Sequence, residues 1–445
     1  MKRIVILGGG ISGYGSAILA KVKGADVFLS DRGTLSSDVE AKLKEWNIAY
    51  EQGQHSEELI LSADLVIKSP GIPDSAAIVK SIRSANIPII SEIEFAGRYL
   101  DGSKTICITG SNGKTTTTSL IYKILADANY SVAVGGNIGE SFAYSVATGS
   151  FDWYVLELSS FQLDGMYDFK ADIAVLLNIT PDHLDRYEYK FENYAASKMR
   201  VTQNQGEGEY FIYFDGDRTI QEEIAKRTLR MKRLSFGKDQ SDVVKVDVQG
   251  EKLAIAASEM QIRGRHNLYN AEAAAMAAAA AGVSAEQIKR SICEFGAVEH
   301  RLQPLCEIEG VLYINDSKAT NVDSVWYALE AMTRPVVWIA GGTDKGNDYN
   351  PLKEFAQNKV HTLVCMGVDN AALQREFAGV IPEIISTGSF DQAMEAARTA
   401  AKSGDVVLLS PACASFDLFR SYIHRGECFT EWVHKLKKEV TDGEQ

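Results

Sequence analysis

Short apolar runs alternate with segments of helical spacing along the first part of the chain. The runs cover residues 3–7, 26–29, 65–68 and 88–90. Apolar runs bounded by turn residues indicate buried strands, and strands that alternate with helices form parallel sheets. The pattern therefore predicts a first α/β domain over residues 1–92.

The same rhythm continues twice more along the chain. In residues 93–298 we expect strands at 105–109, 153–156, 173–177 and 210–214, and helices at 191–201 and 267–281. In residues 299–445 we expect strands at 312–315, 335–340, 362–366 and 406–409. Three α/β domains in series are the result, and no tandem repeat of a solenoid is present.

Composition agrees with a folded chain and narrows the class of partner. The chain has 445 residues, 45% hydrophobic and 24% charged, with a formal net charge of -13. A nucleic-acid surface needs a local excess of Lys and Arg, so we expect no nucleic-acid partner. Small phosphorylated ligands stay compatible with this charge, because a few backbone N–H groups and one lysine can hold them.

Cysteine usage and hydropathy bear on the compartment. The six cysteines form no C-x-x-C pair; they are Cys107, Cys293, Cys306, Cys365, Cys413 and Cys428. Such scatter indicates reduced, mostly buried thiols rather than a disulfide framework or a zinc site. No apolar window approaches the ~18 residues of a membrane span, and no signal-peptide core is present. We therefore expect a cytoplasmic protein without membrane insertion.

The most specific local signal follows the strand expected at 105–109. It is a phosphate-binding loop that runs into a helix and consists of Gly110, Ser111, Asn112, Gly113, Lys114, Thr115 and Thr116. Lys114 can reach the terminal phosphates of ATP, and the Thr115 hydroxyl can ligate Mg²⁺. Ile108 stands where the usual pattern has its first glycine. The alternative is a plain glycine turn between strand and helix.

A second glycine segment, Gly-Gly-Gly-Ile-Ser-Gly at 8–13, follows the first strand, and Asp31 closes the next. This pattern resembles a dinucleotide fingerprint and, alone, favours an NAD-dependent oxidoreductase. A glycine turn that only tightens a βα unit is the structural alternative. These residues indicate a pyrophosphate-binding site but do not identify the nucleotide.

Further polar side chains stand at the carboxyl ends of predicted strands, where open α/β sheets bind ligands. Glu157 and His183 suit Mg²⁺ and Mn²⁺ respectively, although a loop histidine bonded to backbone is the alternative for His183. Asn267 and Asn270 can face an adenine edge or cap a helix. The polar loops at 315–321, 341–346 and 410–417 indicate one shared cleft. The alternative is that they are ordinary surface loops, which carry similar residues.

Taken in order, these segments resemble the Mur ligase family over essentially the whole chain. The resemblance rests on residues 109–116, 136–139, 157–160, 182–183, 198, 266–267, 300–301 and 316–321. Residues 69–72, 341–342 and 410–417 are most similar to the branch of the family that adds D-glutamate. The resemblance implies a Rossmann-like N-terminal domain, a central P-loop ATPase-type parallel sheet and a Rossmann-like C-terminal domain.

The resemblance also implies an activity in peptidoglycan precursor synthesis. ATP would phosphorylate the carboxylate of UDP-N-acetylmuramoyl-L-alanine, and D-glutamate would attack the acyl phosphate. A monomer would carry out this reaction. The family pattern would bind the UDP part through Ser12, Gly13, Asp31, Arg32 and Gly71, and the muramoyl part through Asn137.

The family pattern gives further residues their roles. Thr115 and Glu157 would hold one Mg²⁺ and His183 a second, while Lys198 would carry a carbamate, although Lys198 alone would be interpreted as an exposed helix lysine. ATP would contact Asn267, Asn270, Arg301, Asp316 and Lys318. D-Glutamate would contact Thr320, Lys345, Ser415 and Tyr422, the last standing where phenylalanine is expected. Lys114, His183, Lys198 and Lys318 are the expected catalytic residues.

Two other classes of protein stay open at this point. An NAD-dependent oxidoreductase has the glycine segment 8–13 in its favour, but it leaves the phosphate loop at 110–116 without a task. A non-enzymatic nucleotide-binding regulator has only the phosphate loop in its favour.

Overall fold

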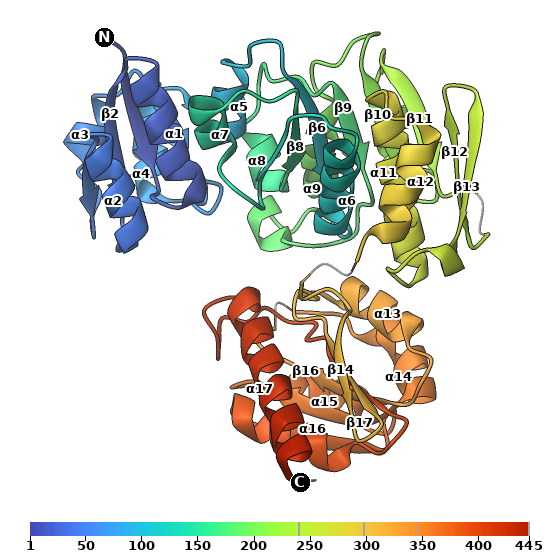
Figure 1. The fold of residues 1–445 in the computed structure, drawn as a ribbon. Coiled ribbons are helices and arrows are strands. Elements are labelled where there is room, and N and C mark those ends of the chain that lie inside the picture. The colour runs from blue at the N-terminus through green and yellow to red at the C-terminus, as the bar shows by residue number, and fades with distance from the viewer. Residues whose placement is uncertain (239–240, 297–298, 345, 444–445) are drawn as a thin grey trace. The chain divides into compact units, whose positions relative to one another are not determined.

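The computed structural model describes residues 1–238, 241–296, 299–344 and 346–443 (Figure 1). The chain forms two compact units, Met1–Glu259 with Tyr269–Glu294, and Met260–Leu268 with Phe295–Gln445. The first unit holds two parallel sheets and the second holds one mixed sheet. The prediction of three α/β domains in series is confirmed.

The first sheet is parallel and has the strand order β3-β2-β1-β4-β5. Its strands are β1 (Arg3–Leu7), β2 (Asp26–Asp31), β3 (Ala49–Gln52), β4 (Leu65–Lys68) and β5 (Ile89–Ile90). The helices among them are α1 (Ile11–Val22), α2 (Ser37–Glu45), α3 (Glu57–Leu61) and α4 (Ala77–Ser84). The order reverses at β1, so β1 and β4 open a crevice at their carboxyl ends.

Alternating side chains of β1 cover both faces of this sheet. Ile4 and Ile6 join the core that contains residues of α1 and α2. Val5 and Leu7 join the opposite core, which contains residues of α3 and α4. A strand buried on both faces has no polar alternation, which explains why the apolar runs were readable in the sequence.

The second sheet is also parallel, with the order β11-β10-β9-β6-β8-β7. Its strands are β6 (Lys104–Thr109), β7 (Val132–Gly136), β8 (Trp153–Glu157), β9 (Ile173–Leu176), β10 (Tyr210–Phe214) and β11 (Lys232–Phe236). Around it lie α5 (Glu92–Gly97), α6 (Lys114–Asp127), α7 (Phe142–Thr148), α8 (Ser160–Asp164), η1 (Leu184–Tyr187), α9 (Phe191–Met199), η2 (Arg200–Thr202) and α10 (Arg218–Ala225). Strand β6 lies between β8 and β9, so three strand ends meet beside the phosphate loop.

The rest of the first unit follows β11. It comprises the antiparallel pair β12 (Val243–Val248) and β13 (Glu251–Ala256), then η3 (Ala257–Glu259), α11 (Arg265–Ala280) and α12 (Ala285–Glu294). Helix α11 is the predicted alanine helix, and most of its alanines are fully buried. The first two sheets share one continuous core, because Leu29 and Leu156 belong to the same hydrophobic cluster.

The third sheet has the order β14-β15-β19-β16-β17-β18. Its strands are β14 (Gln303–Ile308), β15 (Val311–Asn315), β16 (Val336–Ala340), β17 (Val360–Met366), β18 (Glu383–Thr387) and β19 (Val406–Leu409). Its helices are α13 (Val322–Ala331), η4 (Asn350–Leu352), α14 (Lys353–Lys359), α15 (Ala371–Phe377), α16 (Phe390–Ala400) and α17 (Tyr422–Gly443). Strand β14 pairs antiparallel with β15, so this sheet is mixed rather than wholly parallel.

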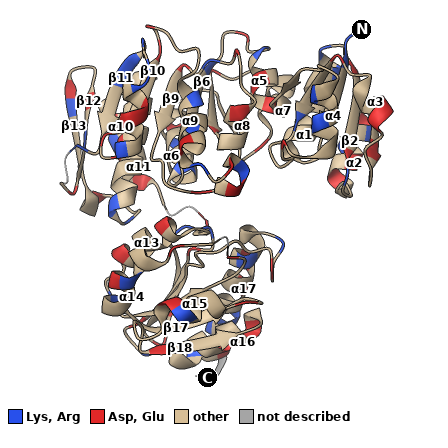
Figure 2. Ribbon diagram, turned by 180° about the vertical axis from the view of Figure 1, so that it is seen from behind, with Lys and Arg blue, Asp and Glu red and all other residues tan. Residues whose placement is uncertain are grey.

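Charged residues of both signs are spread along both units, as the blue and red segments of Figure 2 show. Among the residues that the structure describes, no helix combines the length and the hydropathy needed to cross a membrane. All six cysteines are free thiols, but only Cys107, Cys365 and Cys413 are buried, so the prediction of mostly buried thiols holds for half of them.

Candidate active site

The phosphate loop joins β6 to α6 and is tied to the segment after β9. Gly110 and Gly113 have φ angles of +153° and +85°, which favour glycine, and Gly113 caps α6. The Ser111 hydroxyl donates to the carbonyl of Thr180, and the Asn112 N–H donates to Oδ1 of Asn178 at 2.8 Å. A loop ending in a helix N-terminus directs backbone N–H groups toward an anion, so its geometry suits phosphate.

Lys114 and Asn270 line this loop. Nζ of Lys114 donates to the carbonyls of Gly110 and Ser111, each at 2.8 Å. A Cβ at Gly113 would lie 2.3 Å from Oδ1 of Asn270, so a side chain at this position would displace that amide. The structure thus places Asn270, one of the predicted ATP contacts, directly against the phosphate loop.

The predicted Mg²⁺ ligands Thr115 and Glu157 meet beside the loop. Oγ1 of Thr115 donates to Oε2 of Glu157 at 2.7 Å, and Nδ2 of Asn137 donates to Oε1 of Glu157 at 2.9 Å. Glu157 is the last residue of β8, and both oxygens of its carboxylate are held in place. A hydroxyl and a buried carboxylate fit a hard cation that takes its other ligands from phosphate and water.

In the part of the chain that the structure describes, no three or more His, Cys, Asp or Glu side chains gather to hold a metal. His183 lies on the loop after β9 at φ +52°, with Nε2 3.6 Å from Oδ2 of Asp182 and its ring against Phe161. A second metal beside His183 stays a prediction.

Lys198 is deeply buried, contrary to what a lone helix lysine suggests. It lies on α9 with 2% of its surface exposed, and its Nζ donates to the carbonyl of Gly110 at 2.8 Å and to Oγ1 of Thr109 at 3.3 Å. Burial, and then the charge of Lys114, hold the pKa of Lys198 well below its ordinary value. Burial of an amine in this way favours its neutral form relative to the charged one.

In the second unit, the predicted loop after β15 is anchored by Asp316. Its Oδ2 accepts from the hydroxyl of Ser410 at 2.7 Å, and its Oδ1 accepts from the N–H of Leu302 at 3.1 Å. Burial raises the pKa of Asp316 to about 7, against these hydrogen bonds and the charge of Arg301. Strands β15, β19 and β16 are neighbours, so the three predicted polar loops do leave adjacent strand ends.

Other predicted residues of this unit lie on the loops that follow these strands or on neighbouring segments. Nζ of Lys318 lies 5.1 Å from the centre of the Tyr422 ring, and Ser415 is buried. The N–H of Thr320 donates to the carbonyl of Lys318 at 2.9 Å. Lys345 lies outside the described residues. Asn267 donates to the carbonyl of Arg263 at 2.7 Å within this unit.

A separate pocket of about 860 Å³ lies at the carboxyl edge of the first sheet. Its walls include three of the predicted UDP contacts, Asp31, Arg32 and Gly71, together with Gly8 of the glycine segment. Ser12, another predicted UDP contact, is not among the residues that line this pocket, and its Oγ lies 3.3 Å from that of Ser69. A Cβ at Gly13 would lie 1.9 Å from the carbonyl oxygen of Gly8, so the tight turn requires this glycine.

Three family models match consecutive parts of the chain. They are the MurD N-terminal domain at residues 3–78, the Mur ligase middle domain at 108–278 and the glutamate ligase domain of Mur ligases at 300–413. The UDP-N-acetylmuramoylalanine--D-glutamate ligases of Bacteroides fragilis and Cytophaga hutchinsonii are each 50% identical to this chain. The matches cover 98% of the chain and 100% and 99% of these relatives. The chain belongs to the Mur ligase family.

Solved Mur ligases share the fold. The UDP-N-acetylmuramate-alanine ligase MurC of Thermotoga maritima has a TM-score of 0.63 at 19% identity, covering 98% of this chain and 100% of that one. MurF of Thermotoga maritima in complex with ADP has a TM-score of 0.60 at 18% identity, covering 95% and 99%. Family membership makes the chain an ATP-dependent amide-bond-forming ligase, so the oxidoreductase and regulator hypotheses fall away.

Two residues of this Mur ligase escaped the sequence analysis. Arg425 on α17 is fully buried and donates to the carbonyls of Ser317 and Cys413 and to the Ser317 hydroxyl, which joins two of the polar loops. His55 lines the pocket of the first sheet. Neither lies in a recognisable motif, since Arg425 sits in a helix and His55 follows a polar edge strand.

Proposed function

We propose that the chain is the ligase that joins D-glutamate to UDP-N-acetylmuramoyl-L-alanine with the energy of ATP. The observation that carries the proposal is the end-to-end match to relatives that bear this name, at 50% identity. The placement of the residues that match the family pattern also supports the proposal. Lys114 and Thr115 follow β6, and Glu157 ends the neighbouring strand β8, where it accepts a hydrogen bond from Thr115.

In the first step, an oxygen of the alanyl carboxylate attacks the γ-phosphorus of ATP, and ADP leaves. Lys114 and the N–H groups of residues 110–116 bind the phosphates and offset the charge that gathers on the transferring group. Asn270 holds the adenosine part from its place beside Gly113, together with Asn267, Arg301 and Asp316. Lys318 reaches toward the phosphates.

The second step forms the amide bond. The amine of D-glutamate attacks the carbonyl carbon of the acyl phosphate, the carbon–oxygen bond breaks, and phosphate leaves with the bond electrons and takes up the proton that the nitrogen loses. Phosphorylation is necessary because a free carboxylate has no adequate leaving group. Asn137 contacts the muramoyl part, while Thr320, Lys345, Ser415 and Tyr422 bind D-glutamate, with Lys345 paired to its side-chain carboxylate.

Thr115 and Glu157 would hold Mg²⁺ in this scheme, and His183 would lie beside a second cation, for which Mn²⁺ would also be suitable. When bound, Mg²⁺ neutralises charge on the phosphate oxygens. The protein itself orients the Glu157 carboxylate. The Asn137 amide donates to one of its oxygens and the Thr115 hydroxyl donates to the other.

Lys198 carries a carbamate in our proposal. Its amine would combine with carbon dioxide and release one proton, which creates an anionic oxygen donor in place of a cation. An ammonium cannot ligate a metal, whereas a carbamate can. The burial of Nζ beside the phosphate loop and its lowered pKa support this role, since only a neutral amine reacts with carbon dioxide.

We further propose the organisation and setting of the enzyme. Residues 1–92 bind the UDP part, residues 93–298 bind ATP, and residues 299–445 complete the ATP and amino-acid sites. The enzyme acts as a monomer in the cytoplasm.

A phosphate-release assay with a panel of D- and L-amino acids tests the proposal. Release should require ATP, UDP-N-acetylmuramoyl-L-alanine and D-glutamate together, and L-glutamate should not replace D-glutamate. Full-rate hydrolysis of ATP without either acceptor would refute the proposed ligase.

A further inference from the structure

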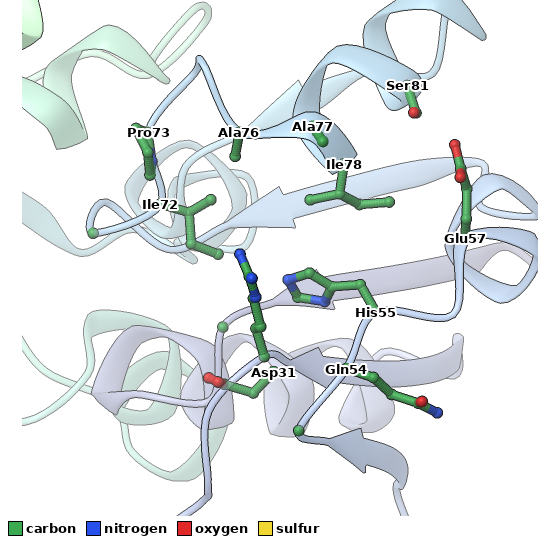
Figure 3. A pocket seen from close by; sticks show the side chains of 14 residues that line it. Asp31, Gln54, His55, Glu57, Ile72, Pro73, Ala76, Ala77, Ile78 and Ser81 are labelled. Atoms are coloured by element: carbon green, nitrogen blue, oxygen red, sulfur yellow. The ribbon is translucent and has the colours of Figure 1, made fainter.

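The pocket at the edge of the first sheet contains a histidine that the family pattern does not use. His55 follows β3 and lines the cavity together with Gln54, Ile72 and Ile78. Figure 3 shows the imidazole reaching into the pocket, on the side opposite Ile78. The inference drawn from it rests on the proposed function, since it takes the UDP part of the substrate as the occupant.

The order of the strands indicates which part of a nucleotide lies near His55. The glycine turn after β1 lies at a helix N-terminus and suits the diphosphate. Asp31 ends β2, the next strand, where such folds hold the ribose. Strand β3 lies beyond β2 in the sheet, so the segment that follows it, with His55, reaches the base end of the pocket.

The opposite wall of this end is apolar. Ile72, Ala77 and Ile78 come from the segment after β4 and from the start of α4. Flat aliphatic surface of this kind packs well on the face of a planar ring. The pocket therefore offers apolar contact to the face of a base, with His55 as a polar group facing it.

A chain of hydrogen bonds orients the His55 ring. Nδ1 of His55 lies 2.7 Å from Oγ of Ser30, and that hydroxyl donates to Oε1 of Glu51 at 2.7 Å. Glu51 also accepts from the N–H and the hydroxyl of Ser56. Burial would raise the pKa of Glu51, but the hydrogen bonds from Ser56 and Ser30 outweigh it and hold the pKa below its ordinary value.

These hydrogen bonds determine which ring nitrogen of His55 carries the proton. An ionised carboxylate only accepts hydrogen bonds, so Glu51 takes the single proton of the Ser30 hydroxyl. The Ser30 oxygen is then an acceptor toward His55, and Nδ1 must be the donor. In the neutral imidazole the other nitrogen, Nε2, is left with a lone pair.

We propose that His55 is a specificity-determining residue that reads the base of the nucleotide substrate, with Nε2 accepting a hydrogen bond from the N3–H of uracil. Cytosine presents a lone pair at N3 in place of this donor, and two facing lone pairs repel. A site that hydrogen-bonds one ligand group rejects an analogue without it more strongly than an apolar pocket does. The Ser30–Glu51 pair is the positioning element of this contact.

Calorimetric binding of UDP, CDP and N3-methyl-UDP to the full-length protein tests the inference without the need for catalysis. The wild type should prefer UDP to both analogues by roughly 10-fold or more. His55→Phe keeps a ring of similar shape and should weaken UDP binding by roughly 3- to 10-fold, with the preference largely lost. His361→Phe, a histidine of the second unit, is the matched control and should leave UDP binding unchanged.

Two results separate the role of the hydrogen-bond chain from simple packing. Nitrogen-15 spectra of the wild-type imidazoles, with His55 assigned from its loss in His55→Phe, should show the Nδ1–H tautomer. Ser30→Ala should reduce the preference for UDP while His55 is still present. An Nε2–H tautomer, or an unchanged UDP-to-CDP ratio in His55→Phe, would overturn the inference. If the wild type makes the amide product, such a result leaves the proposed function intact, whereas absence of product would defeat that function itself.

Discussion

Oγ1 of Thr115 donates a 2.7 Å hydrogen bond to Oε2 of Glu157, although the two residues lie 42 positions apart in the chain. The sheet explains the contact, because β6 and β8 are parallel neighbours in which Ile108 pairs with Glu157. The phosphate loop leaves β6 just beyond that pair. A local motif and a distant acid therefore form one candidate magnesium site.

Replacement of Thr115 tests this site. Thr115→Val keeps the branched shape but removes the hydroxyl, so we expect turnover at low Mg²⁺ to fall by roughly 10- to 100-fold. Thr115→Ser keeps the hydroxyl and is the matched control, with near-normal turnover. The measurement is phosphate release as a function of Mg²⁺ concentration, and a wild-type Mg²⁺ profile for Thr115→Val would exclude Thr115 as a ligand.

Lys198 should be essential through its carbamate rather than through its charge. Lys198→Ala should lose roughly 100-fold or more in turnover, and a small carboxylate or bicarbonate should restore part of it. Lys190→Ala, at the exposed N-terminus of the same helix, should be silent. Normal activity of Lys198→Ala, or of the wild type in buffer stripped of carbon dioxide with no carbamate found by mass spectrometry, would contradict this role.

Asp316 should make stability depend on pH. Burial raises its pKa to about 7, above its unfolded value of 3.8, so the folded state binds the proton more tightly. Its contribution to stability is fully present below about pH 4 and is lost as the pH rises to 7, by at most about 1.4 kcal/mol per pH unit.

Urea unfolding of the wild type and Asp316→Asn between pH 5 and 8 measures this contribution. Asparagine keeps an acceptor for the Leu302 N–H and has no charge to bury. The free energy of unfolding of the variant, relative to the wild type, should rise with pH up to about 7. A difference that does not change with pH would show that the carboxyl is not protonated in the folded state near neutrality.

Arg425 should hold the polar loops of the second unit together. Its guanidinium donates at 2.8 Å to the carbonyl of Ser317 and at 3.3 Å to that of Cys413. Arg425→Met should reduce the free energy of unfolding of this unit by about 3 kcal/mol, since it leaves buried carbonyls without donors. It should also raise the KM for D-glutamate, because Ser415 lies on one of these loops.

Arg420→Met, an exposed arginine of the same segment, is the matched control for Arg425. It should change neither the unfolding curve nor the KM. Equal unfolding curves for Arg425→Met and the wild type would mean that the loops hold their places without this arginine.

The sequence was most informative for strands whose two faces are both buried. Strands such as β1 and β19 are apolar on both faces, so their runs are visible without tertiary information. The edge strand β3 went unpredicted because its four residues are partly or fully exposed. Strand β14 was also missed, and it makes the third sheet mixed.

Residues whose role depends on distant neighbours were harder to predict. Lys198 looks like a surface lysine in its helix, and only the family pattern singled it out; its burial arises from β6 and the phosphate loop around it. Arg425 and His55 depend on partners up to 108 residues and 25 residues away, respectively. No local spacing could have placed either of them.

Transfer of ¹⁸O from substrate to phosphate tests the proposed reaction most directly. UDP-N-acetylmuramoyl-L-alanine labelled with ¹⁸O in its alanyl carboxylate, incubated with ATP, Mg²⁺ and D-glutamate, should yield phosphate with one ¹⁸O atom for each amide bond formed, and none with L-glutamate. Unlabelled phosphate, or phosphate without the D-glutamyl product, would contradict the ligase mechanism.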